Sequence, residues 1–185
     1  MAGSGPLNPC NGADCHFKGD ISTEGSSAQV LFGGASSGTA IINGNTPQKL
    51  FGDTPPRPQF RRLEMNSTGT FELMNQLGLS GTCTFTKGVI KTTNANRLVF
   101  IEGSFSPVTG SAMSYVDGPG RRLSNEAITS FTFPVGKNGK FAPVTISKIA
   151  GADVFGTFQV EYFDGPGPNT SMVNAPISHV SECEY

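Results

Sequence analysis

Carboxylates are the first side chains to consider, because glycan-cleaving enzymes use paired acids that face each other across one groove. In this chain the acidic residues are scattered singly along the sequence. Glu64 and Glu72 would come close only if their strands were neighbours, and two solvated carboxylates on strand faces are the simpler interpretation. The pattern therefore predicts no catalytic pair among the acids considered, which are Glu64, Glu72, Glu102, Asp117, Glu126, Asp153, Glu161 and Asp164.

Histidine is the usual general base for a serine or cysteine nucleophile, and the chain contains two histidines. His16 lies near the start of the sequence and His179 near its end, so neither position indicates a Ser-His-Asp or Cys-His arrangement. We therefore expect no catalytic residues and no enzymatic activity.

The four cysteines, Cys10, Cys15, Cys83 and Cys183, allow three disulfide connectivities. Cys10 and Cys15 enclose a short polar stretch of turn-forming residues, which predicts a local disulfide between them. For Cys83 and Cys183 two outcomes stay open, a bond to each other or two buried thiols. An oxidised local pair is typical of extracellular proteins.

The spacing of the cysteines and histidines supports a haem site or a zinc site less well than it supports a local disulfide. Attachment of a c-type haem at Cys15 and His16 requires the spacing C-x-x-C-H, whereas four residues separate the first two cysteines here. Structural zinc requires two close pairs of ligands, and Cys83, His179 and Cys183 offer only the loose pair His179/Cys183. We expect no cofactor and no metal ion.

The sequence Asp-Gly-Pro-Gly occurs twice, at residues 117–120 and 164–167. Pro followed by Gly suits the two central positions of a type II turn, so we expect a sharp strand exit at each site. Calcium binding by the two aspartates is the alternative. Calcium needs six to eight oxygen ligands, however, and no D-x-D-x-D-G series is present.

Charge and hydropathy argue against two classes of partner. Thirteen basic residues nearly balance fourteen acidic ones, and the arginines adjoin only in the doublets Arg61-Arg62 and Arg121-Arg122. Because nucleic-acid binding needs a basic stripe, we expect no nucleic-acid partner. In each doublet we expect one arginine to face solvent and the other to cap a sheet edge. No apolar run is long enough to cross a membrane, so we expect no membrane insertion.

Short strands are the elements that we expect to position these residues. The chain has 24 glycines and 13 prolines, and its apolar runs are short and separated by turn-forming residues. Residues 70–77 could form a helix, but Phe71 and Leu73 alternate with Glu72 and Met74, and the strand-like neighbourhood favours a strand. The runs lie at residues 28–32, 39–42, 48–51, 60–65, 70–74, 77–85, 88–92 and 97–101.

We predict an all-β chain in which a β-solenoid of parallel coils, about 4.8 Å apart, merges into antiparallel strands from about residue 128. A two-sheet jelly-roll sandwich is the alternative fold. The predicted organisation is a leader at residues 1–6, an N-terminal cap segment at residues 7–27 that contains Cys10 and Cys15, and a single all-β domain at residues 28–185.

A Phe-Pro-Val-Gly-Lys block occupies residues 133–137, and related blocks lie at residues 81–92, 96–100, 114–122, 141–145 and 180–185. In order and spacing these blocks resemble the β-repeat modules of large Bacteroidota cell-surface and secreted proteins exported by the type IX secretion system. The resemblance covers roughly residues 40 to 185, and the Phe-Pro-Val-Gly block is its most specific part. The first 40 residues match no part of the pattern.

The resemblance implies a structural or adhesive repeat module of a large extracellular surface protein, an adhesin without catalytic residues. Neighbouring modules of the same long chain and surface glycans are the implied partners. The alternative is a carbohydrate-binding module of a secreted polysaccharide-active protein, which needs exposed aromatic rings. The chain has no Trp, so only Tyr115, Tyr162, Tyr185 and some phenylalanines could supply them.

Overall fold

The computed structural model describes residues 12–23, 31–32, 38–52, 57–101, 103–105, 107, 109–124, 127–149 and 156–165. All regular structure in this part of the chain is β-strand, so the all-β prediction is confirmed. In the same residues no helix is long and apolar enough to cross a membrane.

Fifteen strands make up the described fold. In chain order they are β1 (Cys15–Phe17), β2 (Ile21–Thr23), β3 (Leu31–Phe32), β4 (Ala40–Ile42), β5 (Gln48–Gly52), β6 (Gln59–Leu73), β7 (Leu77–Lys91), β8 (Leu98–Phe100), β9 (Ser114–Asp117), β10 (Gly120–Ser124), β11 (Ile128–Phe133), β12 (Val135–Lys137), β13 (Lys140–Phe141), β14 (Val144–Ile149) and β15 (Gly156–Val160).

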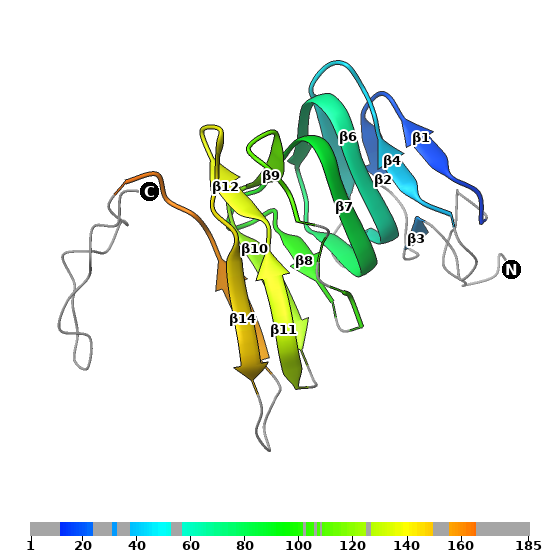
Figure 1. Ribbon diagram of the computed structural model, residues 1–185. Helices are drawn as coiled ribbons and strands as arrows, with labels where there is room; N and C mark the ends of the chain where they lie inside the picture. Colours follow the sequence, from blue (N-terminus) through cyan, green and yellow to red (C-terminus); the bar gives the residue numbers. More distant parts are fainter. Residues whose placement is uncertain are drawn as a thin grey trace, which may run out of the picture.

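Three parallel stacks of strands form the faces of a β-solenoid (Figure 1). Face one contains β3, β6, β7, β8 and β10, face two contains β1, β4, β6 and β7, and face three contains β2, β5, β6, β7, β9 and β12. The long strands β6 and β7 run along all three faces. Register shifts at residues 60–62 and 66–70 mark the corners at which β6 bends from one face to the next. The predicted solenoid is therefore confirmed, and the jelly roll is not the fold.

Ladders of inward-facing side chains fill the core, because successive residues of a strand point to opposite sides. Neighbours in a ladder are one coil apart and in register, so each coil adds one apolar layer. Burying one large apolar side chain of a ladder, such as Leu or Phe, contributes roughly 1.5–3 kcal/mol. The buried ladders are Phe60, Leu79 and Phe100 on face one; Ala40, Leu63 and Cys83, and Ile42, Met65 and Phe85, on face two; and Phe71, Ile90, Val116 and Val135 on face three.

Strand pairing becomes antiparallel toward the C-terminal end, where β15 pairs with β10 and β11 pairs with β14. β11 begins at Ile128, in agreement with the predicted transition. The rings of Phe131 and Phe133 lie 5.1 and 6.2 Å from the ring of Phe100, measured between centroids. These edge-to-face contacts join the antiparallel pair to the last coil of the solenoid.

The segment 70–77, considered as a possible helix, belongs to two strands and the bend between them. β6 ends at Leu73 and β7 begins at Leu77. Phe71 and Leu73 are buried, whereas Met74 is exposed. The alternation along residues 71–74 therefore correctly favoured a strand over a helix.

A sharp strand exit is present at the first Asp-Gly-Pro-Gly sequence, where β9 ends at Asp117 and β10 begins at Gly120. The expected type II geometry is wrong, however, because the positive φ of 116° belongs to Gly118. Gly120 already pairs with Leu98 and Val160 as the first residue of β10. It is therefore extended, and it cannot supply the left-handed turn position.

The arginine doublets depart from the expected arrangement of one solvent-facing residue and one edge cap. Arg61 and Arg62 are both exposed. In β10, Arg121 faces outward, but Arg122 is only 5% exposed and points into the core. The prediction for Arg122 is wrong because alternation along β10 puts residue 122 on the same side as the buried Gly120 and Ser124.

Candidate functional site

Glu64 and Glu72, considered as a catalytic pair, lie on different faces of the solenoid. On face two, Glu64 Oε1 accepts hydrogen bonds from Asn66 Nδ2 at 3.0 Å and from Thr86 Oγ1 at 3.4 Å. On face three, Glu72 Oε2 lies 3.6 Å from Lys49 Nζ. The structure does not bring the two carboxylates together, and each interacts with side chains of its own face.

Both aspartates of the Asp-Gly-Pro-Gly sequences contact lysines of β12 and β13. Asp117 Oδ1 lies 3.9 Å from Lys137 Nζ. Asp164 accepts hydrogen bonds from Lys140 Nζ at 2.6 Å and from Asn138 Nδ2 at 3.1 Å, and these bonds lower the pKa of its carboxyl group. Within the described residues, no three His, Cys, Asp or Glu side chains are grouped so as to hold a metal ion.

The cysteine and histidine predictions fall partly outside the described residues. Cys15 is half-buried at the start of β1, and the adjacent His16 is exposed, with its Nδ1 atom 2.9 Å from Asn43 Nδ2. Cys83 is a buried free thiol, which is one of the two outcomes left open for it, and burial raises its pKa. The Cys10–Cys15 disulfide stays a prediction. The remaining two cysteines and the second histidine, which are Cys10, Cys183 and His179, lie outside the described residues.

Neither of the two described tyrosines that were considered for a sugar-binding platform is an exposed residue. Tyr115 is buried on β9, and its Oη atom accepts a hydrogen bond from the backbone N–H of Gly139 at 2.9 Å. Tyr162 is half-buried against the core, and Tyr185 lies outside the described residues. Tyr115 therefore has a packing role in the described fold.

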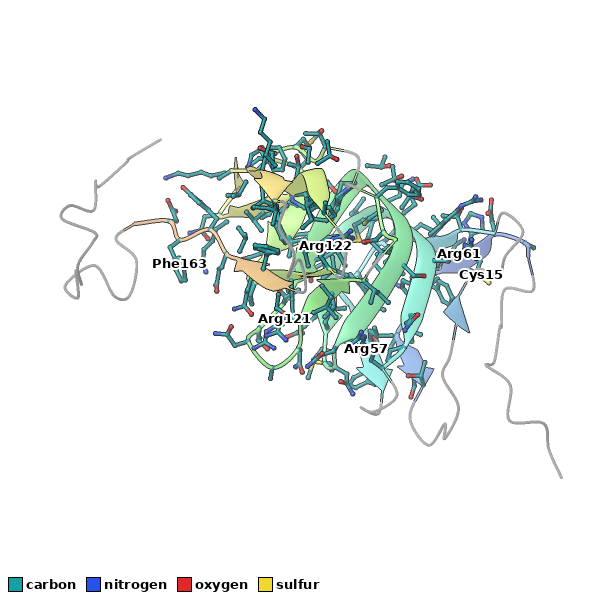
Figure 2. The ribbon with its side chains drawn as sticks, turned by 90° about the horizontal axis from the view of Figure 1, so that it is seen from below. Cys15, Arg57, Arg61, Arg121, Arg122 and Phe163 are labelled. Carbon is teal, nitrogen blue, oxygen red and sulfur yellow. The ribbon has the colours of Figure 1, made fainter. Side chains whose placement is uncertain are left out.

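A cluster of three arginines, which the sequence did not reveal, lies on the outer side of face one. Arg121 of β10 is in register with Val99 of β8, which continues the row formed by Gln59 and Gly78. Arg57 and Arg97 each lie two residues before a member of that row, so alternation gives them the same outward direction. In Figure 2, Arg57 and Arg121 lie along the same side of the molecule, away from Arg61. We call Arg57, Arg97 and Arg121 the arginine cluster.

Gly78 allows the side chain of Arg57 to lie close against the strands. A Cβ atom at Gly78 would be 2.9 Å from Gln59 Cγ and 3.2 Å from Arg57 Nε. All three arginines of the cluster are half-buried, and the Nε atom of each is buried without a hydrogen-bond partner. The arginine stems therefore pack on the sheet surface instead of extending freely into solvent.

The arginine cluster brings three positively charged guanidinium groups together on one surface. Partial burial and the positive charge of Arg121 lower the pKa of both Arg57 and Arg97. Among the described residues no carboxylate forms an ion pair with any of the three, whereas Lys49, Lys137 and Lys140 each have one. The cluster is thus a concentration of positive charge that no carboxylate of the described residues neutralises.

Amide side chains border the arginine cluster. Arg121 Nη2 donates a hydrogen bond to Gln159 Oε1 at 3.4 Å, and Gln159 Nε2 donates to Asn94 Oδ1 at 3.0 Å. Gln159 belongs to β15 and is in register with Arg121. Such a surface can bind an anion through the guanidinium groups and hydroxyl groups through the amides.

A shallow groove of about 540 Å³ is a second surface feature, and it lies at the corner between faces two and three. The hydroxyl group of Ser67, a buried residue of the lining, already has two hydrogen-bond partners, since it donates to Gly44 O at 2.7 Å and accepts from Gly69 N at 3.0 Å. The more accessible lining includes Asn45, Thr68, Lys87 and Met113.

Comparison with known proteins found no matching family model, no matching curated protein and no matching solved structure. The resemblance to type IX-exported surface modules therefore stays a prediction, and functional inference depends on the geometry described above.

Proposed function

We propose that this chain is a structural or adhesive module of a large extracellular surface protein, without catalytic activity, and that face one contacts surface glycans. The observation that carries the proposal is the arginine cluster, because it holds three positive groups on a stack of parallel strands and none of them has a carboxylate partner within the described part of the chain. Clusters of this kind are costly unless a ligand or partner compensates the charge.

A parallel stack suits adhesion because its backbone holds the outward side chains at a fixed spacing of about 4.8 Å per coil. Beside the cluster, Gly78 N donates to Pro58 O at 2.9 Å, and Leu77 N donates to Arg97 O at 3.0 Å. These bonds fix the backbone adjacent to two of the three arginines. Groups that are positioned before binding lose less conformational freedom when the ligand arrives.

Repetition of the module in a long chain would make weak contacts sufficient for adhesion. Linked binding sites act at a high effective concentration, so avidity rises without any single strong site. Neighbouring modules of the same chain are the proposed protein partners. Export by the type IX system and a Cys10–Cys15 disulfide are part of the same proposal, since local disulfides persist outside the cell.

A carbohydrate-binding module of a secreted polysaccharide-active protein is the second candidate function. The groove between faces two and three favours it, because its lining combines the polar residues Thr68, Asn45 and Lys87 with apolar ones such as Val89 and Met113. Such a module would bind one sugar tightly as a monomer, whereas an adhesive module depends on many weak contacts.

A glycan array and a substrate panel test these functions together. We expect the monomeric domain to bind weakly, the same domain displayed in many copies to be retained on glycan surfaces, and no glycan, ester or peptide to be turned over. Micromolar or tighter binding of the monomer to one neutral sugar would favour the carbohydrate-binding module. Turnover that disappears in Glu64→Gln or Glu72→Gln would overturn the non-enzymatic proposal.

A further inference from the structure

We propose that the arginine cluster is a binding site for an anionic glycan, whose carboxylate or sulfate groups lie between Arg121 and its two neighbours, Arg57 and Arg97. The inference rests on the proposed adhesive function and gives it a ligand class. Nothing in the composition indicates such a site, because the chain as a whole has a net charge of −1.

Charge imbalance is the first argument for an anionic ligand. Three guanidinium groups share one outer surface, and no described carboxylate forms an ion pair with any of them. Burial and the positive charge of Arg121 lower the pKa of both Arg57 and Arg97, so Arg121 repels each of its two neighbours. A bound anion would offset this repulsion.

Guanidinium geometry is the second argument, because arginine pairs with carboxylate and sulfate oxygens through parallel N–H donors. The buried Nε atoms show that the three stems are packed against the strands. The terminal nitrogens of the three guanidinium groups are therefore held by side chains that have already lost most of their conformational freedom. Gly78 is part of this arrangement, since a Cβ atom there would lie 3.2 Å from Arg57 Nε.

The spacing of the charges suits a polymer that carries acidic groups at intervals. Arg57 precedes β6, Arg97 precedes β8 and Arg121 lies in β10, so the cluster spans four successive strands of face one. Two coils separate Arg57 from Arg97, which corresponds to about 10 Å. An acidic polysaccharide carries a charged group on every sugar or every second sugar, so it can place two of these groups across this distance.

The surroundings favour a glycan over a nucleic acid. Gln59, Asn94 and Gln159 offer amide donors and acceptors, which suit sugar hydroxyl groups. No aromatic side chain lies in the outward row of Gln59, Gly78, Val99, Arg121 and Gln159, whereas single-stranded nucleic acids bind through stacking on exposed rings.

Binding of oligogalacturonate to the purified domain, compared with its methyl-esterified form, tests the carboxylate arm. A heparin-derived oligosaccharide, compared with its desulfated form, tests the sulfate arm. We expect the more highly charged member of at least one pair to bind at least 10-fold more tightly than its counterpart, with an affinity that falls as salt rises. Whichever pair shows the difference identifies the acidic group.

Two variants and one control assign the site. Arg121→Gln should weaken binding of the charged oligosaccharide at least 10-fold, whereas Arg61→Gln, which removes the same charge from an exposed position outside the cluster, should leave it unchanged. Gly78→Ala changes no charge but crowds Arg57 and Gln59, so it should also weaken binding. Circular dichroism and thermal unfolding show whether each variant keeps the fold.

The outcomes separate the ligand class from the proposed function. Retention of the wild type on glycan surfaces, with equal affinity for the two members of each oligosaccharide pair, would overturn the anionic site and leave the adhesive function standing. Failure to bind any glycan, even when many copies are displayed, would overturn both. Binding of a single-stranded oligonucleotide that is tighter than any glycan and is lost in Arg121→Gln would refute the glycan assignment.

Discussion

The buried arginine of β10 gives the sharpest prediction about stability. Arg122 takes the position in the face-one ladder that follows Phe100, so a guanidinium group continues a row of apolar side chains. Its Nη1 atom donates hydrogen bonds to Ile101 O and Ser104 O, both at 2.9 Å, and to Ser104 Oγ. Its Cζ atom lies 4.8 Å from the centre of the Phe131 ring. The residue therefore connects the last coil to the antiparallel pair.

Arg122→Ala should destabilise the protein by about 4 kcal/mol. Two backbone carbonyl groups would lose a charged donor, at about 1–3 kcal/mol each, and the contact with Phe131 would add about 1 kcal/mol. For a chain of this size the loss corresponds to about 8–16 °C in Tm. Arg122→Lys should cost about 2 kcal/mol, since an ammonium group keeps the charge but lacks the planar set of donors.

Urea unfolding followed by circular dichroism measures both effects. Arg121→Ala is the matched control, because Arg121 is the adjacent residue of the same strand and differs mainly in facing outward. We expect the control to change the free energy of unfolding by less than about 1 kcal/mol. Equal losses for Arg121→Ala and Arg122→Ala would refute the assignment of Arg122 to the core and the alternation along β10.

Three further predictions follow from local geometry. In urea unfolding, Gly88→Ala should lower the free energy of unfolding by at least about 2 kcal/mol, because Gly88 has a φ of 95° and a Cβ atom there would lie 2.6 Å from a backbone oxygen. Gly103→Ala should lower it by about 1 kcal/mol, because Gly103 has a φ of 74° but open space around it. A larger loss for Gly103→Ala than for Gly88→Ala would contradict the register. Peptide mapping after alkylation at pH 8 should find Cys83 unmodified in the native protein and modified in urea, since burial raises the pKa of its thiol. Equal labelling of Cys83 in the native and the urea-unfolded protein would contradict its burial. An NMR titration should give Asp164 a pKa below its usual value of about 3.9, and this pKa should be higher in Lys140→Gln. The pair therefore stabilises the fold above about pH 4, and the stabilisation is lost as the pH falls through the lowered pKa. An unchanged pKa in the variant would contradict the pairing.

Much of the fold could be predicted from the sequence because its signals are local. Alternation within a run such as residues 70–74 identifies a strand whatever the strand pairs with. Frequent glycine, asparagine and proline marks the places where the strands end.

The arginine cluster could not be predicted, because it depends on register between coils. Gln59, Gly78, Val99 and Arg121 are adjacent in space but are separated by 19, 21 and 22 residues in the sequence. With coils of unequal length, no fixed period connects Arg57, Arg97 and Arg121. The inward direction of Arg122 was missed for a similar reason, since its orientation follows from the position at which β10 starts.

Adhesion of beads that display many copies of the domain tests the central claim most directly. The beads are applied to a surface coated with the acidic oligosaccharide that binds best, and the wild type is compared with a variant that carries Arg57→Gln, Arg97→Gln and Arg121→Gln. We predict that wild-type beads are retained in low salt and released in high salt, that the triple variant is not retained, and that the glycan keeps its length. Equal retention of the two kinds of bead, or shortening of the glycan by the wild type, would contradict the account.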